Sequence, residues 1–277
     1  MSPHTQGFFP PENILVPTDL GPSSEAALRA AGCFEKCCGA KLHVLHAHMV
    51  EMPPYFSSGQ IETLLETLRT AREAAGAYVS AEVERILGHP TRAAIVEKPP
   101  LTAVLDAIDD LAIDLVVMGT HGRRGAERAW IGSVAEGVVR RSTCPVLTVR
   151  EDAKLDALKR VLCAVDEGDQ TTLAYAGALA ERFGARLIAL HVSAEGEAVT
   201  RCPCVSDDMT RGRPAREIVR QGERSQAILA TVADEGVDLV VMGSRRKSSP
   251  FGELFSTTTE RVLRLISIPL LVIPRAS

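Results

Sequence analysis

The chain has 277 residues, 45% of them hydrophobic, and 31 basic residues nearly balance 35 acidic ones to give a net charge of −4. This composition excludes a disordered or collagen-like chain and argues against a general nucleic-acid binder. No apolar run approaches the roughly 20 residues of a membrane-spanning helix, and Met1–Pro11 lacks the basic and apolar regions of a secretory signal, so we expect a cytoplasmic protein.

In the first half of the chain, short apolar runs alternate with helical patterns. The runs predict five buried strands: Asn13–Thr18, Lys41–Ala47, Ala93–Val96, Leu115–Met118 and Pro145–Val149. The helical patterns predict four helices: Pro22–Cys38, Ser58–Leu87, Leu101–Leu111 and Ser133–Arg140. In the second of these helices, one apolar stripe runs from Ile61 to Tyr78 and Val79. Strands that alternate with helices predict right-handed crossovers and a parallel sheet covered on both faces.

The second half repeats this pattern over Arg160–Pro274. The segment DLVVMG at Asp114–Gly119 recurs at Asp238–Gly243, with an offset of 124 residues. Earlier in the two halves the offset is larger: it is 145 residues between His46 and His191, and 147 residues between Asp19 and Asp166. The second copy is therefore shorter by about one helix between its second and third strands, where Ser193–Arg213 is polar and irregular. We expect two doubly wound α/β domains, residues 1–150 and 151–277, each with a five-stranded parallel sheet, joined by a charged linker at Arg150–Lys159.

The residues that follow the first and fourth strands suggest a ligand site. Ligands of open parallel sheets bind beyond the carboxyl ends of the strands. Pro17, Thr18 and Asp19 follow the first strand, and a glycine-rich segment begins at Gly119 and ends where Gly132 and Ser133 open a helix. Glycines let backbone approach an anion, and a helix N-terminus supplies N–H donors. Asp19 suits a ribose hydroxyl or an adenine amine, or is simply a turn residue at a helix start. The sequence predicts a nucleotide site.

These residues resemble the universal stress protein family in its tandem, two-domain form. Its nucleotide-binding members carry Gly, two residues, Gly, nine residues, then Gly and Ser or Thr, a pattern that Gly119, Gly122, Gly132 and Ser133 match. The segments ILVPTD, VLHA and CPVLTV add to the resemblance, which covers nearly all of Asn13–Pro274. It implies a Rossmann-like, HUP-type fold and ATP, with or without Mg²⁺, bound by the first domain.

The resemblance also implies a role for each site residue. Pro17, Thr18 and Asp19 would lie at the adenosine end, and Ala47 and Met118 would line the base. The remaining residues would follow and close over the phosphates: Gly119, His121, Gly122, Arg123, Gly132, Ser133 and Val134. In the second copy, Arg246 and Ser256 replace two glycines and Thr257 follows. Because a side chain there obstructs phosphate, we expect this half to bind nucleotide weakly or not at all.

Several other residues have competing interpretations. His46 and His191 end matching strands and are expected to be hydrogen-bonded core residues. Seven cysteines, an odd number, favour reduced thiols over a disulfide framework. Cys202 and Cys204 lie in the irregular segment of the second half. Together with one candidate histidine they supply too few ligands for a zinc site, so no metal is assigned. An exposed thiol pair or ordinary loop cysteines are the preferred interpretations. The other expectations are structural: core positions for Cys33, Cys37, Cys38 and Cys163, and packing for Trp130.

Three functions stay open. The first is an ATP-binding stress or regulatory switch, in which nucleotide orders His121–Ile131 and hydrolysis is at most slow; no catalytic residue is assigned, because no Walker motif or nucleophile–base set is present. The second is an ATP-using transferase or hydrolase assisted by His121 and Arg123. The third is a metal, redox or small-ligand sensor centred on the second domain. Adenine nucleotide is the expected partner, with no nucleic acid or membrane. By family resemblance, Pro145–Val149 and Ile268–Ile273 would pair within one chain as a pseudo-dimer, and further homodimerisation stays open.

Overall fold

A computed structural model describes residues 9–49, 58–120, 131–153, 155, 158–166, 168–194, 216–245, 247–249, 252–254 and 257–275. The first half comprises β1 (Asn13–Pro17), α1 (Pro22–Cys38), β2 (Lys41–His48), α2 (Ser58–Leu87), β3 (Ala93–Glu97), α3 (Pro100–Asp110), β4 (Leu115–Gly119), α4 (Ser133–Arg141) and β5 (Val146–Val149). The second half comprises β6 (Arg160–Val165), α5 (Gln170–Phe183), β7 (Arg186–Ser193), β8 (Arg216–Gln221), α6 (Arg224–Glu235), β9 (Leu239–Arg245), β10 (Lys247–Ser249), β11 (Gly252–Leu254), α7 (Thr257–Leu265) and β12 (Leu270–Arg275). The nine elements predicted in the first half are all present, with ends that agree within one residue.

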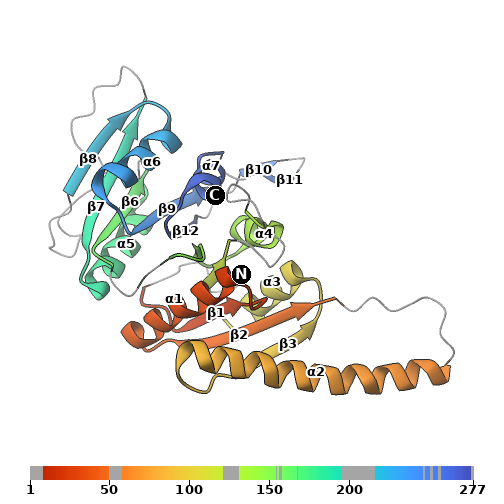
Figure 1. The fold of residues 1–277 in the computed structure, drawn as a ribbon. Helices are drawn as coiled ribbons and strands as arrows, with labels where there is room; N and C mark the ends of the chain where they lie inside the picture. The colour runs from red at the N-terminus through yellow and green to blue at the C-terminus, as the bar shows by residue number, and fades with distance from the viewer. Residues whose placement is uncertain are drawn as a thin grey trace.

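The two halves share one ten-stranded sheet, ordered β3-β2-β1-β4-β5-β12-β9-β6-β7-β8 (Figure 1). Each half contributes five parallel strands, which confirms the predicted fold class. β5 and β12 are antiparallel, with Leu147 opposite Leu271, and the Thr148 hydroxyl donates to the Leu270 carbonyl at 3.2 Å. The expected pairing of the last strands within one chain is therefore confirmed.

Ion pairs between α4 and α7 repeat the symmetry of this junction. Within the helices, Arg140 pairs with Glu136 at 2.7 Å and Arg264 pairs with Glu260 at 2.7 Å. Between them, Arg140 lies 3.5 Å from Glu260 and Arg264 lies 3.8 Å from Glu136. One Glu and one Arg of α4, together with their counterparts 124 residues later in α7, thus form a closed set of four ion pairs about a pseudo-twofold axis.

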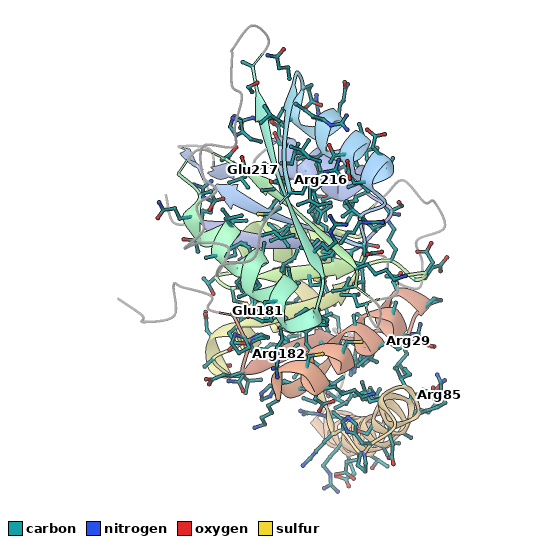
Figure 2. All side chains as sticks on the ribbon, turned by 90° about the vertical axis from the view of Figure 1, so that its left-hand side faces the viewer. Arg29, Arg85, Glu181, Arg182, Arg216 and Glu217 are labelled. Atoms are coloured by element: carbon teal, nitrogen blue, oxygen red, sulfur yellow. The ribbon has the colours of Figure 1, made fainter. Side chains whose placement is uncertain are left out.

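Helices cover both faces of the sheet and enclose two hydrophobic cores. α1, α2 and α5 pack on one face, and α3, α4, α6 and α7 pack on the other. On the first face, the rings of Phe34 and Phe183 meet edge to face at 5.1 Å and join the halves. Burial raises the pKa of the Cys38 thiol of α1, and the charge of Arg182 near the end of α5 (labelled in Figure 2) opposes this rise. The leucines of the charged linker, Leu155 and Leu158, are buried, so the linker is anchored in the core.

Three features differ from the sequence analysis or lie beyond it. Tyr78, predicted on the buried stripe of α2, is 61% exposed, because the helix packs through Val79 and Val83, which are 3% and 0% exposed. The antiparallel hairpin of β10 and β11 between β9 and α7 was not predicted. Most of Ser193–Arg213, where a helix is missing from the repeat, lies outside the described residues. In the part of the chain that the structure describes, no helix is long and apolar enough to span a bilayer.

Candidate functional site

A cleft of about 280 Å³ opens beyond the carboxyl ends of β1, β2 and β4. This volume is close to the lower end of the roughly 300–1,000 Å³ typical of small-molecule sites. Nine of the twelve predicted site residues line it: Pro17, Thr18, Asp19, Ala47, Met118, Gly119, Gly132, Ser133 and Val134. The other three, His121, Gly122 and Arg123, lie in residues 121–130, outside the described part of the chain. The structure therefore gathers every described member of the predicted set around one cavity.

The walls of the cleft also include residues that the sequence analysis did not single out. Leu45 and Val104 add apolar surface, while Ser24 and Thr120 add hydroxyl groups. Pro100, the first residue of α3, also lines the cleft. Apolar walls beside a few polar groups are typical of small-molecule sites, in which the polar groups fix the orientation of the ligand.

Asp19 forms the turn that was one of the two roles considered for it, and it lies at the wall of the cleft. Its Oδ1 atom accepts hydrogen bonds from the Gly21 N–H at 2.9 Å and the Ser24 hydroxyl at 2.6 Å. This Asx turn starts α1, and it places Leu20 in the left-handed region at φ 60°. The turn interpretation is confirmed, and it also fixes the carboxylate at the wall of the cleft.

Gly119 ends β4 where α1 approaches most closely. A Cβ atom added here would lie 2.7 Å from both the backbone carbon and the Cβ of Ser23. No real Cβ makes such contacts with backbone, so only glycine allows this packing. The glycine is thus required by the fold, whatever ligand the cleft accepts.

The N-terminus of α4 faces the same cleft. Gly132 is its N-cap at φ −65° and ψ 143°, and the Gly132 N–H donates to the Thr120 carbonyl at 2.7 Å. Ser133, Val134 and Ala135 follow, and all three line the cleft. The first N–H groups of an α-helix have no acceptor within the helix, and the helix dipole favours an anion beside them.

His46 and His191 make the same contact in the two halves. The Nδ1 atom of His46 lies 2.8 Å from the Thr18 carbonyl oxygen, and that of His191 lies 3.4 Å from the Val165 carbonyl oxygen. A carbonyl only accepts, so in each case Nδ1 carries the proton. Both histidines tie the second strand of their half to the end of the first, which confirms the structural role predicted for them.

The second half differs at the counterpart of the cleft. Asp166, the equivalent of Asp19, pairs with Arg224 at 3.1 Å and with Arg275 at 3.6 Å. Arg275 also lies 3.1 Å from Asp169, whose side chain is 2% exposed. Arg224 stands 124 residues after Pro100, so a cation replaces a cleft-lining proline.

These side chains crowd the glycine that matches Gly119. A Cβ on Gly243 would meet the Asp169 carboxylate, the Arg275 Cδ at 2.7 Å and the Thr172 hydroxyl at 2.9 Å. Sequence reasoning had stressed Arg246 and Ser256, which lie outside the described residues. It missed Arg224, although an alignment of the halves at 124 residues reveals the exchange with Pro100.

None of the five cysteines in the described residues forms a disulfide. Cys163 is fully buried, as predicted, and burial raises the pKa of the Cys144 thiol to about 12. Cys33, Cys37 and Cys38 are only partly buried, and Cys202, Cys204 and Trp130 lie outside the described part. Among the described residues, no group of three or more His, Cys, Asp or Glu side chains is arranged to hold a metal ion.

Comparisons with known proteins agree with this architecture. The family model described as "Universal stress protein family" matches residues 11–150 and 209–274. A universal stress protein of Mycolicibacterium smegmatis is 26% identical over 285 residues, covering 94% of this chain and 96% of that protein. The universal stress protein MJ0531 of Methanocaldococcus jannaschii is 30% identical over 146 residues, covering 52% of this chain and 84% of that protein. The crystal structure of a universal stress protein from Archaeoglobus fulgidus superposes with a TM-score of 0.70 at 24% identity, over 95% of this chain and 98% of that one.

Proposed function

The chain belongs to the universal stress protein family, and from the geometry of its first cleft we propose that it binds one adenine nucleotide, ATP with or without Mg²⁺, as a nucleotide-dependent regulatory switch. The observation that carries the proposal is the cleft itself, in which nine predicted site residues meet the N-terminus of α4. The residues named for the two alternatives, His121 and Arg123 for the transferase and Cys202 and Cys204 for the sensor, lie outside the described part of the chain.

The chemistry of the cleft fits the parts of a nucleotide. Apolar groups from Leu45, Ala47, Val104 and Met118 suit the faces of an adenine ring. The Asp19 carboxylate suits a ribose hydroxyl, because it is an acceptor and would repel phosphate. The amides that open α4 suit the phosphates. The ligand would therefore lie with its base against β2 and β4 and its phosphates towards α4.

The second half would not bind a second nucleotide in the same way. Arg224 and Arg275 already neutralise Asp166, and Arg275 lies over Gly243. A ligand would have to displace these ion pairs and leave the buried Asp169 without its cation, which is costly. We therefore expect one nucleotide per chain.

Nucleotide contact with residues 121–131 would alter the surface presented to a partner, and this is the proposed switch. Such a role needs no general base, and we expect ATP turnover well below the roughly 1–10³ s⁻¹ of typical enzymes.

Isothermal titration of the nucleotide-free chain with ATP tests the proposal. We expect a stoichiometry near one, and at least tenfold weaker binding for Gly132→Ala, because Gly132 lines the cleft at the helix start proposed to receive phosphate, while φ −65° suits alanine. Gly76→Ala, on α2 and outside this cleft, is the matched control and should bind as the wild type does.

Each alternative outcome has a separate meaning. A stoichiometry of two would contradict the expectation that the second half does not bind a nucleotide in the same way. Absence of ATP binding would refute the nucleotide proposal. Rapid phosphate release in the same samples would favour the enzyme alternative.

A further inference from the structure

A groove of about 750 Å³ runs between α2 and β3, on the far side of the first half from the junction with the second. Its helical wall is one face of α2, made of Arg69, Arg72, Glu73, Gly76, Ala77 and Ser80. Its other wall is residues 92–96, five in a row. Since consecutive strand residues point to opposite faces, a run of five means that the groove follows the backbone of β3.

β3 is the last strand of the sheet and pairs only with β2 among the described residues. Ala93 and Ile95 are buried beneath α2, Ala94 is exposed, and no charged residue lies between Arg92 and Glu97. Exposed edges of this kind are templates for another strand, and proteins normally protect them with charges, proline or a cover.

The opposite end of the sheet is protected in that way. β8 carries Arg216 and Arg220, which form ion pairs with Glu235 and Asp234 of α6. Figure 2 shows Arg216 and Glu217 of β8 at the other end of the molecule from Arg85 of α2. The contrast between the two edges indicates that the β3 edge is left open to pairing with another strand.

The groove is also basic. Arg69 is shared between Glu66 at 2.8 Å and Glu73 at 3.8 Å. Arg72 and Arg92 are exposed, and neither has a carboxylate within 4.0 Å among the described residues. Small residues keep the groove open between these charges, and at Gly76 even an added Cβ would make only an ordinary 3.5 Å contact with Ile95.

We propose that this groove binds an extended, acidic segment of a partner protein, which adds to β3 as a further strand of the sheet. Main-chain hydrogen bonds along β3 would supply affinity, as in other complexes formed by strand addition. Carboxylates at alternate positions would reach Arg72 and Arg92, which would select acidic sequences. This site is separate from the nucleotide cleft and does not depend on it.

The test uses the full chain and a fluorescein-labelled octapeptide of alternating valine and aspartate, followed by fluorescence anisotropy. We expect binding, slower hydrogen exchange of the β3 amides, and at least tenfold weaker binding for Arg72→Glu with Arg92→Glu. Arg141→Glu with Arg186→Glu changes the net charge equally at exposed sites outside the groove and should leave affinity within twofold.

Changes to the probe keep the test independent of protein folding. Methylation of every second peptide nitrogen removes strand hydrogen bonds, and lysine in place of aspartate reverses the charge; both should abolish binding. Undiminished binding of either peptide, or of the aspartate peptide to the Arg72→Glu, Arg92→Glu variant, would overturn the proposal. So would absence of binding at millimolar peptide, or tighter binding of an oligouridylate of equal length.

Discussion

Replacement of Gly119 by alanine isolates the tightest contact at the candidate site. No positive φ is found at Gly119, so alanine is compatible with its backbone and the only cost is steric. The new methyl carbon would lie 2.7 Å from two Ser23 carbons and 2.9 Å from the Ser23 carbonyl oxygen. These atoms belong to the first turn of α1, so relief requires a shift of the helix and not merely a side-chain rotation.

The expected magnitude follows from this geometry. Overpacking of a core by one methyl group typically costs about 1–3 kcal/mol, and backbone contacts favour the upper part of that range. An unfolding entropy of about 2.1 cal/mol/K per residue gives about 0.6 kcal/mol/K for 277 residues. We therefore expect Gly119→Ala to lower Tm by about 3–5 °C and to weaken ATP binding, because α1 carries Ser24 in the wall of the cleft.

Differential scanning calorimetry with Gly76→Ala as the control distinguishes this cause from a general effect of removing glycine. Gly76 lies inside α2, where alanine stabilises a helix by about 0.5–1 kcal/mol, and its new Cβ would contact Ile95 at 3.5 Å. The two variants should thus shift Tm in opposite directions. Equal Tm values for Gly119→Ala and the wild type would refute the argument that Ser23 is held rigidly against β4.

Three further predictions follow from buried groups. Because burial raises the pKa of Cys144 to about 12, iodoacetamide at pH 8 should modify this thiol only after unfolding, as peptide mass mapping would reveal. Burial and Lys41 lower the pKa of His43 in the folded chain, so the unfolded chain binds more protons at this residue. The free energy of unfolding should therefore rise with pH up to about 6.5, the ordinary pKa of histidine. Chemical denaturation at several pH values should find a smaller rise for His43→Gln. Arg275→Met should destabilise the chain by about 3–5 kcal/mol, since the buried Asp169 loses its cation, and a smaller loss in urea titration would indicate that the pair is dispensable.

Most of the fold could be predicted because each element has a strong local signal. The helix Pro22–Cys38 was predicted with its observed ends, since Pro lies at its start and Gly39 adopts the left-handed conformation that ends it. The pairing of β5 with β12 came from family resemblance, as no local pattern encodes a contact between strands more than 120 residues apart. The exposed Tyr78 shows the limit of periodicity, because a wide apolar stripe does not state which of two adjacent residues faces the sheet.

The candidate site was predictable where motif residues follow strands, and less so where helices contribute. Pro100 and Val104 belong to α3, and nothing in their local sequence marks them as wall residues of the cleft. Arg275 escaped notice for the same reason: it is the last residue of β12, and only the folded sheet brings it beside Asp166 and Asp169. Long-range contacts of this kind depend on topology, which a motif does not contain.

The internal repeat separates residues that the fold requires from residues that a ligand would require. Features kept in both halves serve the fold: Asp114 and Asp238 accept the backbone N–H groups at the starts of β1 and β6. Gly119 and Gly243 likewise permit close packing in both halves, so the first of the three motif glycines is no evidence for nucleotide. Pro100 differs, because its counterpart Arg224 fills the second site with charge. The case for a ligand in the first half therefore depends on the positions where the halves diverge, and those are the positions to mutate.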